Sequence, residues 1–115
     1  MSDTCIFCKI ISGQIPATII GENDAAVAFR DINPQAPVHL LIIPRQHVAA
    51  LSEIGNLPAD TVQSMLQLAA DLAASEGVQQ SGYRLVTNEG PDSGQSVFHL
   101  HWHLLGGQTM TNEFA

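Results

Sequence analysis

Three of the chain's five histidines lie within five residues: His99, His101 and His103. Successive side chains of a β-strand point to opposite faces, so a strand through this run would put the three imidazoles on one face, about 6.6 Å apart from one to the next, with the residues between them in a core. A neutral imidazole can transfer a proton near neutral pH, attack an electrophilic phosphorus or bind a metal ion. The run therefore predicts a functional site on one face of a strand.

The spacing of these histidines leaves their chemistry open. In a catalytic site, His101 in the middle would attack phosphorus and form a phosphoryl-histidine that water later cleaves, while His103 would donate to the phosphate. A His-x-His pair on a strand also suits zinc. A third interpretation is that the histidines only face solvent.

A polar loop with two glycines, residues 88–96, leads directly into the histidine run. Glycine permits a close approach of the backbone to a ligand, and successive amide N–H groups can cradle an anion. The Ser96 hydroxyl could also pass a proton to a leaving group. Many such loops only connect strands, but the position of this loop immediately before the histidines favours a role in binding phosphate.

Cys5 and Cys8 form a second constellation. Two thiolates separated by two residues supply half of a tetrahedral zinc site and need two further ligands. The alternative is two small apolar residues in a short helix. The N-terminus lacks the basic start of a secretion signal, and no apolar run approaches the roughly 20 residues of a membrane span, so we expect a cytoplasmic protein with reduced thiols.

The elements that must position these residues are short strands and two helices. The expected elements are a short helix over 5–12, strands over 18–21, 25–30 and 38–43, a long helix over 58–76, and strands over 83–87 and 97–105. Asp3 or Thr4 is the expected N-cap of the short helix. The apolar stripe of the long helix comprises Val62, Met65, Leu66, Ala69, Leu72 and Ala73. Strands in a row with one long helix predict an antiparallel α+β sheet.

The composition predicts one globular domain over residues 1–115. Hydrophobic residues make up 45% of the chain and charged residues only 13%, a composition typical of a globular protein and not of a disordered one. A surface with so few charges also leaves room for a subunit interface. The formal net charge of −7 argues against binding to nucleic acid or to an anionic membrane. It remains compatible with a small nucleotide held by backbone amides and histidines.

The run from His99 to Leu105 resembles the signature of the histidine triad (HIT) family, His-φ-His-φ-His-φ-φ, in which φ is hydrophobic. The similarity extends to segments 29–39, 42–47, 88–90 and 94–97, and it favours the Hint branch, the histidine triad nucleotide-binding proteins. The resemblance implies a HIT fold, a five-stranded antiparallel sheet with one long and one short helix, in a homodimer whose subunits join their sheets. It also implies a purine-nucleoside phosphoramidate hydrolase.

The resemblance implies a role for individual positions. His101 matches the nucleophile, which attacks the α-phosphorus and forms a nucleotidyl-histidine, and His103 matches the histidine that contacts the phosphate. His39 matches a histidine that supports the active-site strand, which is nearly the role of a satisfied core histidine. The remaining matched positions flank the ribose, at Asp31 and Ile32, or contact the phosphate side, at Asn88, Gly94, Gln95 and Ser96.

In family members that keep the cysteine pair, the resemblance implies a structural zinc. Its ligands here would be Cys5, Cys8, His47 and His99. Such a zinc would pin the N-terminal helix to the sheet and fix His99 next to the nucleophile. Many Hint proteins lack the cysteines and fold without zinc. The resemblance implies no organic cofactor, and no Mg²⁺ motif is apparent.

The chain departs from the family pattern in two places. Trp102 stands where the family usually has a smaller aliphatic residue, which demands a larger cavity or an interface. The tail, residues 106–115, lacks the aromatic, proline-containing end that in the Hint branch reaches toward the partner's active site, which leaves the preferred leaving group open. The alternative for the tail is disorder after Gln108.

We therefore expect a homodimer that binds purine mononucleotides and hydrolyses phosphoramidates such as adenosine 5′-monophosphoramidate. One alternative is another HIT reaction, dinucleoside polyphosphate hydrolysis or nucleotidyl transfer. His103 disfavours the transferases, which have glutamine there, and the sequence Gly94-Gln95-Ser96 favours Hint over the polyphosphate hydrolases. The other alternative is a zinc-stabilised regulatory protein that binds nucleotide with little catalysis.

Overall fold

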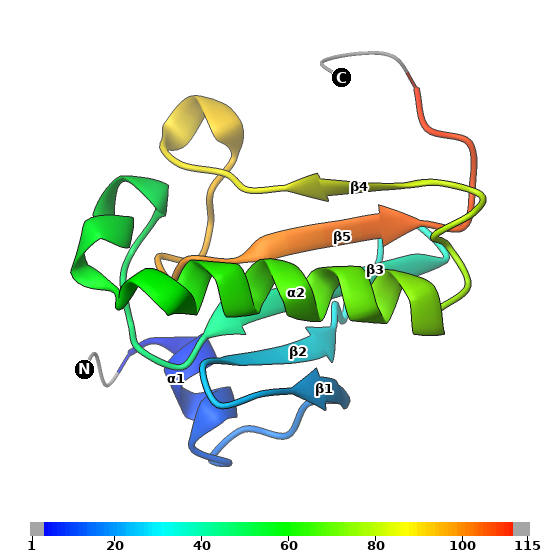
Figure 1. Cartoon of the computed structure of the whole chain (residues 1–115). Helices are drawn as coiled ribbons and strands as arrows, with labels where there is room; N and C mark the ends of the chain where they lie inside the picture. Colours follow the sequence, from blue (N-terminus) through cyan, green and yellow to red (C-terminus); the bar gives the residue numbers. More distant parts are fainter. Residues whose placement is uncertain (1–3, 112–115) are drawn as a thin grey trace.

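The computed structural model describes residues 4–111, which form a five-stranded antiparallel sheet with a helix on each face (Figure 1). The strands are β1 (Ile19–Glu22), β2 (Ala26–Arg30), β3 (Val38–Pro44), β4 (Tyr83–Val86) and β5 (Trp102–Gly106), in the order β1-β2-β3-β5-β4 across the sheet. The helices are α1 (Ile6–Ile11) and α2 (Ala59–Ser75), with 3₁₀ turns at Leu51–Asn56 and Pro91–Ser93. The expected α+β class is confirmed, as is the five-stranded antiparallel sheet with one long and one short helix.

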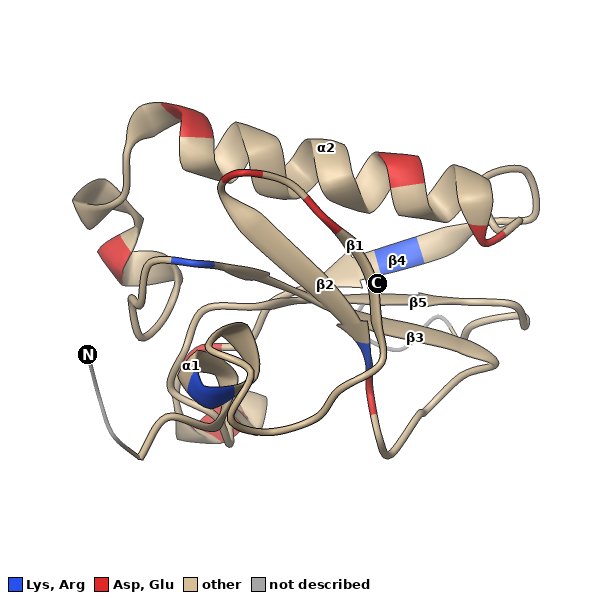
Figure 2. Ribbon diagram, turned by 90° about the horizontal axis from the view of Figure 1, so that it is seen from below, with Lys and Arg blue, Asp and Glu red and all other residues tan. Residues whose placement is uncertain are grey.

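The two helices cover opposite faces of the sheet, as Figure 2 shows. The buried face of α2 comprises Thr61, Met65, Leu68, Ala69, Leu72 and Ala73. The predicted apolar stripe was wrong at Leu66, whose side chain is 43% exposed. The buried face of the helix is centred on Met65, and Leu66, about 100° further round the helix, lies beyond its edge. No helix in the described part of the chain is long and apolar enough to cross a bilayer.

Trp102 lies in the core between the sheet and α2. Its side chain is buried in one cluster with Met65, Leu100 and Leu104, so the extra volume of the indole is absorbed in this layer. Its indole N–H has no hydrogen-bond partner among residues 4–111. This face of β5 is therefore an apolar core, and the histidine chemistry must lie on the other face.

β5 is shorter than predicted. It begins at Trp102, whereas the alternating sequence predicted a strand over 97–105. The N–H of Leu100 donates to the carbonyl of Val48 at 2.8 Å, outside the sheet, and residues 97–99 form a bend. Of the three histidines, only His103 lies within the strand, while His99 and His101 precede it.

The N-cap of α1 is Cys5, where the sequence predicted Asp3 or Thr4. The Sγ atom of Cys5 accepts a hydrogen bond from the N–H of Cys8 at 3.3 Å, so the thiol takes the capping role. Asp3 lies outside the described residues. The cap places both cysteines at the start of a helix that packs on the sheet.

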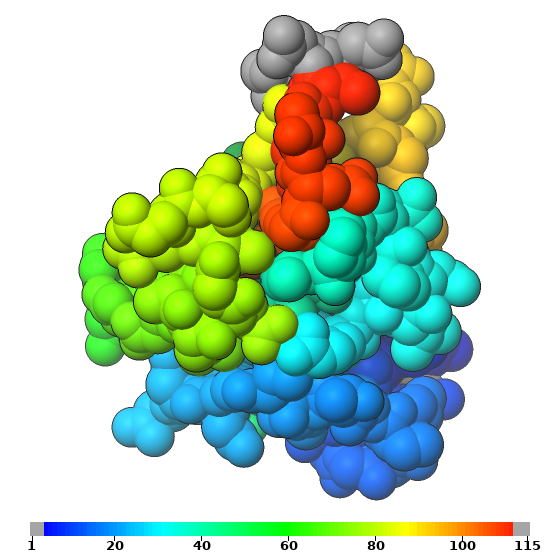
Figure 3. Space-filling model, turned by 90° about the vertical axis from the view of Figure 1, so that its right-hand side faces the viewer, coloured from blue at the N-terminus to red at the C-terminus, as the bar shows by residue number. Residues whose placement is uncertain are grey.

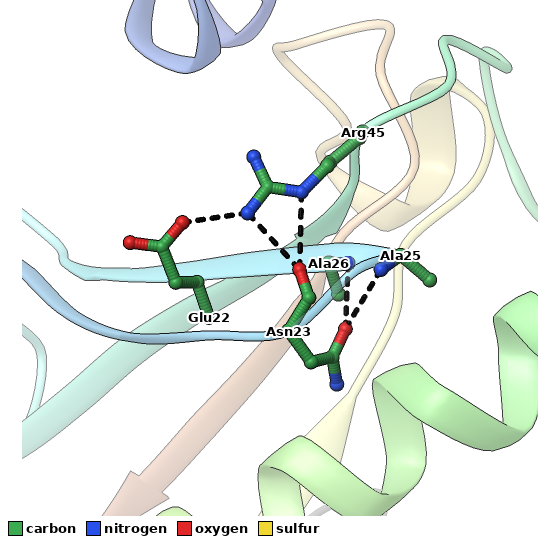
Figure 4. Close-up of polar contacts among 5 residues, drawn as sticks. All are labelled: Glu22, Asn23, Ala25, Ala26 and Arg45. Carbon is green, nitrogen blue, oxygen red and sulfur yellow. Dashed lines mark hydrogen bonds and ion pairs between the residues drawn. The ribbon is translucent and has the colours of Figure 1, made fainter.

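Asn23 organises the turn between β1 and β2 (Figure 4). Its Oδ1 accepts from the N–H groups of Ala25 and Ala26 at 3.0 and 2.9 Å. Its carbonyl accepts from the guanidinium of Arg45 at 3.0 and 3.1 Å, and Arg45 also donates to Glu22 at 2.6 Å. The end of β3 is thereby fixed to the β1–β2 hairpin.

The segment after β5 follows the surface of the molecule toward the edge of β4. Figure 3 shows this orange-red segment beside the yellow-green residues that precede β4. Gly107 has a φ of +89°, which favours glycine, and a Cβ there would lie 3.0 Å from Pro37, a contact so close that Pro37 would have to shift. Arg84 of β4 donates to the carbonyl of Thr111. The last residues of the divergent tail, 112–115, lie outside the described residues.

Candidate active site and metal centre

The ring of His101 is buried and held by the backbone. Its Nδ1 lies 2.7 Å from the carbonyl oxygen of His99, which can only accept, so Nδ1 carries the ring proton and Nε2 carries the lone pair. Burial lowers the pKa of His101, although this hydrogen bond and Asp31 act in the opposite direction. His101 is therefore a neutral imidazole with an unprotonated Nε2.

A chain of hydrogen bonds fixes the proton of His103. The N–H of Gln35 donates to Nδ1 of His39 at 3.0 Å, so the proton of a neutral His39 sits on Nε2. That Nε2–H donates to Nδ1 of His103 at 2.9 Å, which leaves the proton of His103 on its own Nε2. Burial is the main cause that lowers the pKa of His39 and brings the pKa of His103 to about 4. His103 thus offers an N–H donor beside the lone pair of His101, with 4.9 Å between ring centroids.

Asp31 is held at the edge of this arrangement. Its N–H donates to the carbonyl of His39 at 3.0 Å, and its Oδ1 accepts from the N–H of Asn33 at 2.8 Å. Its other oxygen, Oδ2, lies 3.4 Å from Nε2 of His39. The next residue, Ile32, is 89% exposed. A carboxylate and a projecting apolar side chain therefore stand side by side at the rim of the histidine site.

A cavity of about 290 Å³ connects these residues. Its lining includes the predicted site residues Asp31, Ile32, Ser96, His101 and His103. Much of the remaining lining is apolar and includes Ile6, Phe7, Ile10, Ile15, Phe29 and Leu41. These apolar residues were not predicted as site residues, because those in α1, β2 and β3 have the same spacing as side chains that only fill a core. The cavity joins proton-transferring groups to a surface that suits a flat apolar ring.

The polar loop before β5 is held by its own side chains. Oε1 of Gln95 accepts from the N–H of Gly90 at 3.0 Å, and its Nε2 donates to the carbonyl of Ala49 at 3.0 Å. Glu89 accepts from the N–H and the hydroxyl of Ser52, at 3.0 and 2.6 Å. The loop is thereby tied at two points to the segment that follows β3.

Ser96 is the predicted loop residue that reaches the cavity. Asn88, Gly94 and Gln95 are not among the described residues that line it. Gly90 and Gly94 flank the turn Pro91–Ser93 with φ values of +89° and +83°, a backbone conformation that favours glycine. Of the predicted loop residues, Ser96 is therefore the one that a ligand in the cavity would contact, while the side chain of Gln95 holds the loop in place.

The structure brings Cys5, Cys8, His47 and His99 together, with their donor atoms all within 4.8 Å of one another. Nδ1 of His99 lies 3.3 Å from Sγ of Cys5, 3.6 Å from Sγ of Cys8 and 3.1 Å from Nδ1 of His47. Sγ of Cys8 lies 3.4 Å from Nδ1 of His47. Both thiols are free and buried. The four residues come from α1, the segment after β3 and the bend before β5, so they join three parts of the chain.

This donor set fits zinc. Nε2 of His99 lies 2.9 Å from the carbonyl of Pro44 and therefore carries the ring proton, which leaves the Nδ1 lone pair facing the thiols. Ligand atoms bound at about 2.0–2.3 Å around a tetrahedral zinc are about 3.5 Å apart, close to the separations found here. Burial lowers the pKa of His99 to about 4, and burial raises the pKa of the Cys8 thiol to about 11. A bound cation would counter the effect on the thiol by stabilising its thiolate.

A second group of potential ligands, Asp31, His39 and His103, also lies within 4.8 Å. Here the Gln35 N–H occupies Nδ1 of His39 and forces the proton onto Nε2, the atom that would have to bind the ion. This cluster is therefore a hydrogen-bond relay and not a ligand set.

Basic side chains contribute little free charge to the cavity. The sequence has four of them, Lys9, Arg30, Arg45 and Arg84, and only Arg30 is among the residues that line the cavity. The guanidinium of Arg30 forms two hydrogen bonds with the carboxylate of Glu76, at 2.8 and 3.0 Å. A phosphate group in this cavity would therefore be held by neutral N–H and O–H donors.

The chain is similar to known proteins in both sequence and structure. Residues 12–110 match the family described as "HIT domain". The purine nucleoside phosphoramidase of Escherichia coli K12 is 41% identical over 110 residues, which cover 96% of this chain and 92% of that protein. Adenylylsulfatase HINT1 of Arabidopsis thaliana is 46% identical, over 91% of this chain and 72% of that protein. The structure of a HIT family hydrolase from Clostridium thermocellum superposes with a TM-score of 0.94 at 44% identity and covers all of both chains.

Proposed function

This chain belongs to the HIT domain family, and from that premise we propose that it hydrolyses purine nucleoside phosphoramidates through a covalent nucleotidyl-histidine. Its relatives include HIT family hydrolases and a purine nucleoside phosphoramidase. The observation that carries the proposal is the proton placement of His101. The carbonyl of His99 accepts a hydrogen bond from the Nδ1–H of His101, so the unprotonated Nε2 of His101 is available to attack phosphorus.

The reaction proceeds in two displacements at the same phosphorus. Nε2 of His101 attacks the α-phosphorus in line with the P–N bond, which breaks as the amine takes a proton from the Ser96 hydroxyl. Water then attacks the phosphorus of the adduct, breaks the P–N bond to His101 and returns a proton to Ser96. The products are a nucleoside 5′-monophosphate and the free amine, and His101 is regenerated as a neutral imidazole.

Neutral hydrogen-bond donors stabilise the charge that develops on the phosphoryl oxygens. The Nε2–H of His103 and the backbone N–H of Ser96, the loop residue that lines the cavity, are the donors in this proposal. Because no unpaired Lys or Arg among residues 4–111 lines the cavity, the site is suited to one phosphate group. A polyphosphate bridge would bring several further negative charges to a chain of net charge −7, which disfavours dinucleoside polyphosphates as substrates.

The nucleoside portion fits the remainder of the cavity. The Asp31 carboxylate accepts from the ribose hydroxyls beside Ile32, and the purine lies against the apolar lining that includes Phe7 and Phe29. A purine has two fused rings and would cover more of this apolar lining than the smaller pyrimidine, so we expect a purine to be preferred. No organic cofactor enters the scheme.

Cys5, Cys8, His47 and His99 would hold a structural zinc. The ion would cross-link α1, the segment after β3 and the bend before β5, and it would supply a folding constraint, not a reacting group. We further propose that the protein is a cytoplasmic homodimer.

The mass of the protein during turnover tests the nucleophile. Wild type and His101→Ala are mixed briefly with adenosine 5′-monophosphoramidate, quenched and weighed intact, while AMP release is measured in parallel. We expect wild type to release AMP and to carry a transient adduct of one adenylyl group, and His101→Ala to show neither. Near-normal turnover by His101→Ala would refute the assignment. AMP binding by wild type without turnover or adduct would favour the regulatory nucleotide-binding alternative.

A second leaving group merits the same assay. The relative from Arabidopsis is named an adenylylsulfatase, and the same attack on an α-phosphorus would displace sulfate from adenosine 5′-phosphosulfate in place of an amine. Turnover of adenosine 5′-phosphosulfate and of a diadenosine polyphosphate is therefore compared with that of the phosphoramidate. We expect the diadenosine polyphosphate to be the slowest of the three, and a preference for it would favour the polyphosphate hydrolase alternative.

A further inference from the structure

We propose that Phe7 couples the metal site to the nucleotide cavity, so that metal binding and nucleotide binding strengthen each other. The proposal rests on the nucleotide-binding function given above and adds a regulatory link to it. Metal and nucleotide occupy different residues, and α1 is the element that touches both.

Phe7 lies between the two sites. Its ring is buried and packs edge-on against the nucleophile, with 5.1 Å between the ring centroids of Phe7 and His101 and an interplanar angle of 88°. The same ring lies 5.8 Å from His99, a metal-site residue, and 5.4 Å from Phe29. Phe7 and Phe29 both line the cavity. One side chain therefore contacts the metal site, the nucleophile and the surface for the base.

The position of Phe7 depends on the two cysteines that flank it. Cys5 is the N-cap of α1 and Cys8 is in its first turn, and both Sγ atoms lie within 3.6 Å of Nδ1 of His99. A helix of six residues is not stable by itself and needs tertiary contacts to persist. A cation bound to both cysteines would fix the two ends of the segment that carries Phe7. Loss of the cation would release that segment and unseat the ring from His101.

A second contact runs through the backbone of His99. Its side chain turns Nδ1 toward the cysteines, while its carbonyl accepts the Nδ1–H of His101 at 2.7 Å. A change in the orientation of His99 therefore reaches the hydrogen bond that fixes the proton of His101. Because binding linkage is reciprocal, any factor by which the metal raises nucleotide affinity must equal the factor by which nucleotide raises metal affinity.

Paired binding measurements test the coupling in the full chain. The Kd of AMP is measured by calorimetry for zinc-loaded and chelator-stripped protein, and the Kd of zinc is measured by competition with a chromophoric chelator, with and without saturating AMP. We expect both factors to be equal and at least about fivefold, the low end of typical couplings. AMP that merely sequestered zinc in solution would weaken the apparent zinc affinity, the opposite sign.

Phe7→Ala is the variant that separates coupling from folding. We expect it to bind zinc at one ion per chain while the coupling factor falls toward one, and Phe7→Leu to restore part of it. Ile11→Ala is the matched control, because Ile11 packs on the same apolar cluster of α1 but does not line the cavity, and it should keep the coupling. Cys5→Ser/Cys8→Ser should bind no zinc and should match stripped wild type in its AMP affinity.

Several results would overturn the coupling. These are equal AMP affinity with and without metal, full coupling retained in Phe7→Ala, or no zinc bound by wild type. Equal and measurable AMP affinity in both forms leaves the proposed function standing. Failure of AMP to bind either form refutes the proposed function and the coupling together.

Discussion

Backbone groups fix the positions of the ring protons on the histidines of the candidate site. The carbonyl of His99 accepts from His101, and the amide of Gln35 begins the chain that runs through His39 to His103. No charged residue sets this pattern, since Asp31 lies 3.4 Å from His39, beyond an ordinary hydrogen bond. At the residue scale, the site holds two neutral imidazoles with complementary proton placement: Nε2 of His101 carries a lone pair and Nε2 of His103 carries a proton, which suits the proposed roles of nucleophile and donor.

His39 offers a direct test of this proton placement. In His39→Phe the ring remains but the donor to Nδ1 of His103 is lost, so the proton of His103 is free to move to Nδ1. We expect kcat/KM to fall about 10–100-fold, as for the loss of one buried hydrogen bond that orients a catalytic group. Nitrogen-15 shifts of the His103 ring report the tautomer. Unchanged shifts with reduced activity would contradict this explanation of the loss.

The lowered pKa values predict activity that persists in mild acid. His101 and His103 must both be neutral, and burial places the pKa of each below the ordinary 6.5, with His103 at about 4. The acid limb of the kcat/KM profile should therefore lie well below pH 6.5. Because these pKa values are lowered in the folded state, the unfolded chain binds more protons than the folded chain between pH 6.5 and 4. The free energy of unfolding should therefore fall as the pH drops through this range. An acid limb at or above pH 6.5 would show that these rings are not desolvated.

The loop before β5 acts as one element because Gln95 ties it to Ala49 and Gly90. Gln95→Glu keeps the oxygen that accepts from Gly90 but removes the donor to Ala49. We expect kcat/KM to fall about tenfold, the effect of roughly 1.4 kcal/mol from a lost hydrogen bond and a misplaced loop. Gln80→Glu is the control, because it makes the same change in charge at an exposed position. Equal losses in the two variants would attribute the effect to charge alone.

The sequence predicted the bounds of those helices and strands that have a clear local pattern of apolar residues. β3 and α2 differ from expectation by one residue at their ends, because a continuous apolar run and a helical stripe with clear end signals specify them. β5 was predicted five residues too early, since the alternation continues through His99 although the Leu100 N–H bonds to Val48 outside the sheet. The role of Phe7 and the proton relay through His39 depend on contacts between distant segments, which no local pattern encodes.

At the scale of the whole molecule, the described sheet ends in two edge strands, β1 and β4. Within residues 4–111, β4 pairs only with β5, and its residues Tyr83 and Leu85 are each 38% exposed, with Leu66 of α2 also exposed. An open, partly apolar edge strand favours pairing with a second copy of the chain. This geometry agrees with the expected joining of two sheets across a homodimer.

Leu85→Glu tests the expected dimer. We expect wild type to sediment at twice the mass of the chain, and the variant to dissociate at least tenfold more readily, because two like charges would meet near the symmetry axis. Ile54→Glu places the same charge on an exposed apolar residue of the turn Leu51–Asn56 and should remain dimeric. A wild-type protein that sediments as a monomer at micromolar concentration would exclude this arrangement.

The buried indole of Trp102 predicts a distinctive fluorescence for this protein. Trp102 is the chain's only tryptophan, and it is buried against α2, on the face of the sheet away from the cavity. An indole in dry, apolar surroundings fluoresces at a shorter wavelength than one in water. A nucleotide in the cavity lies on the other side of the sheet, so it cannot quench this emission by contact. Any change in colour or intensity on ligand addition would therefore measure how far a disturbance passes through the sheet into the opposite layer.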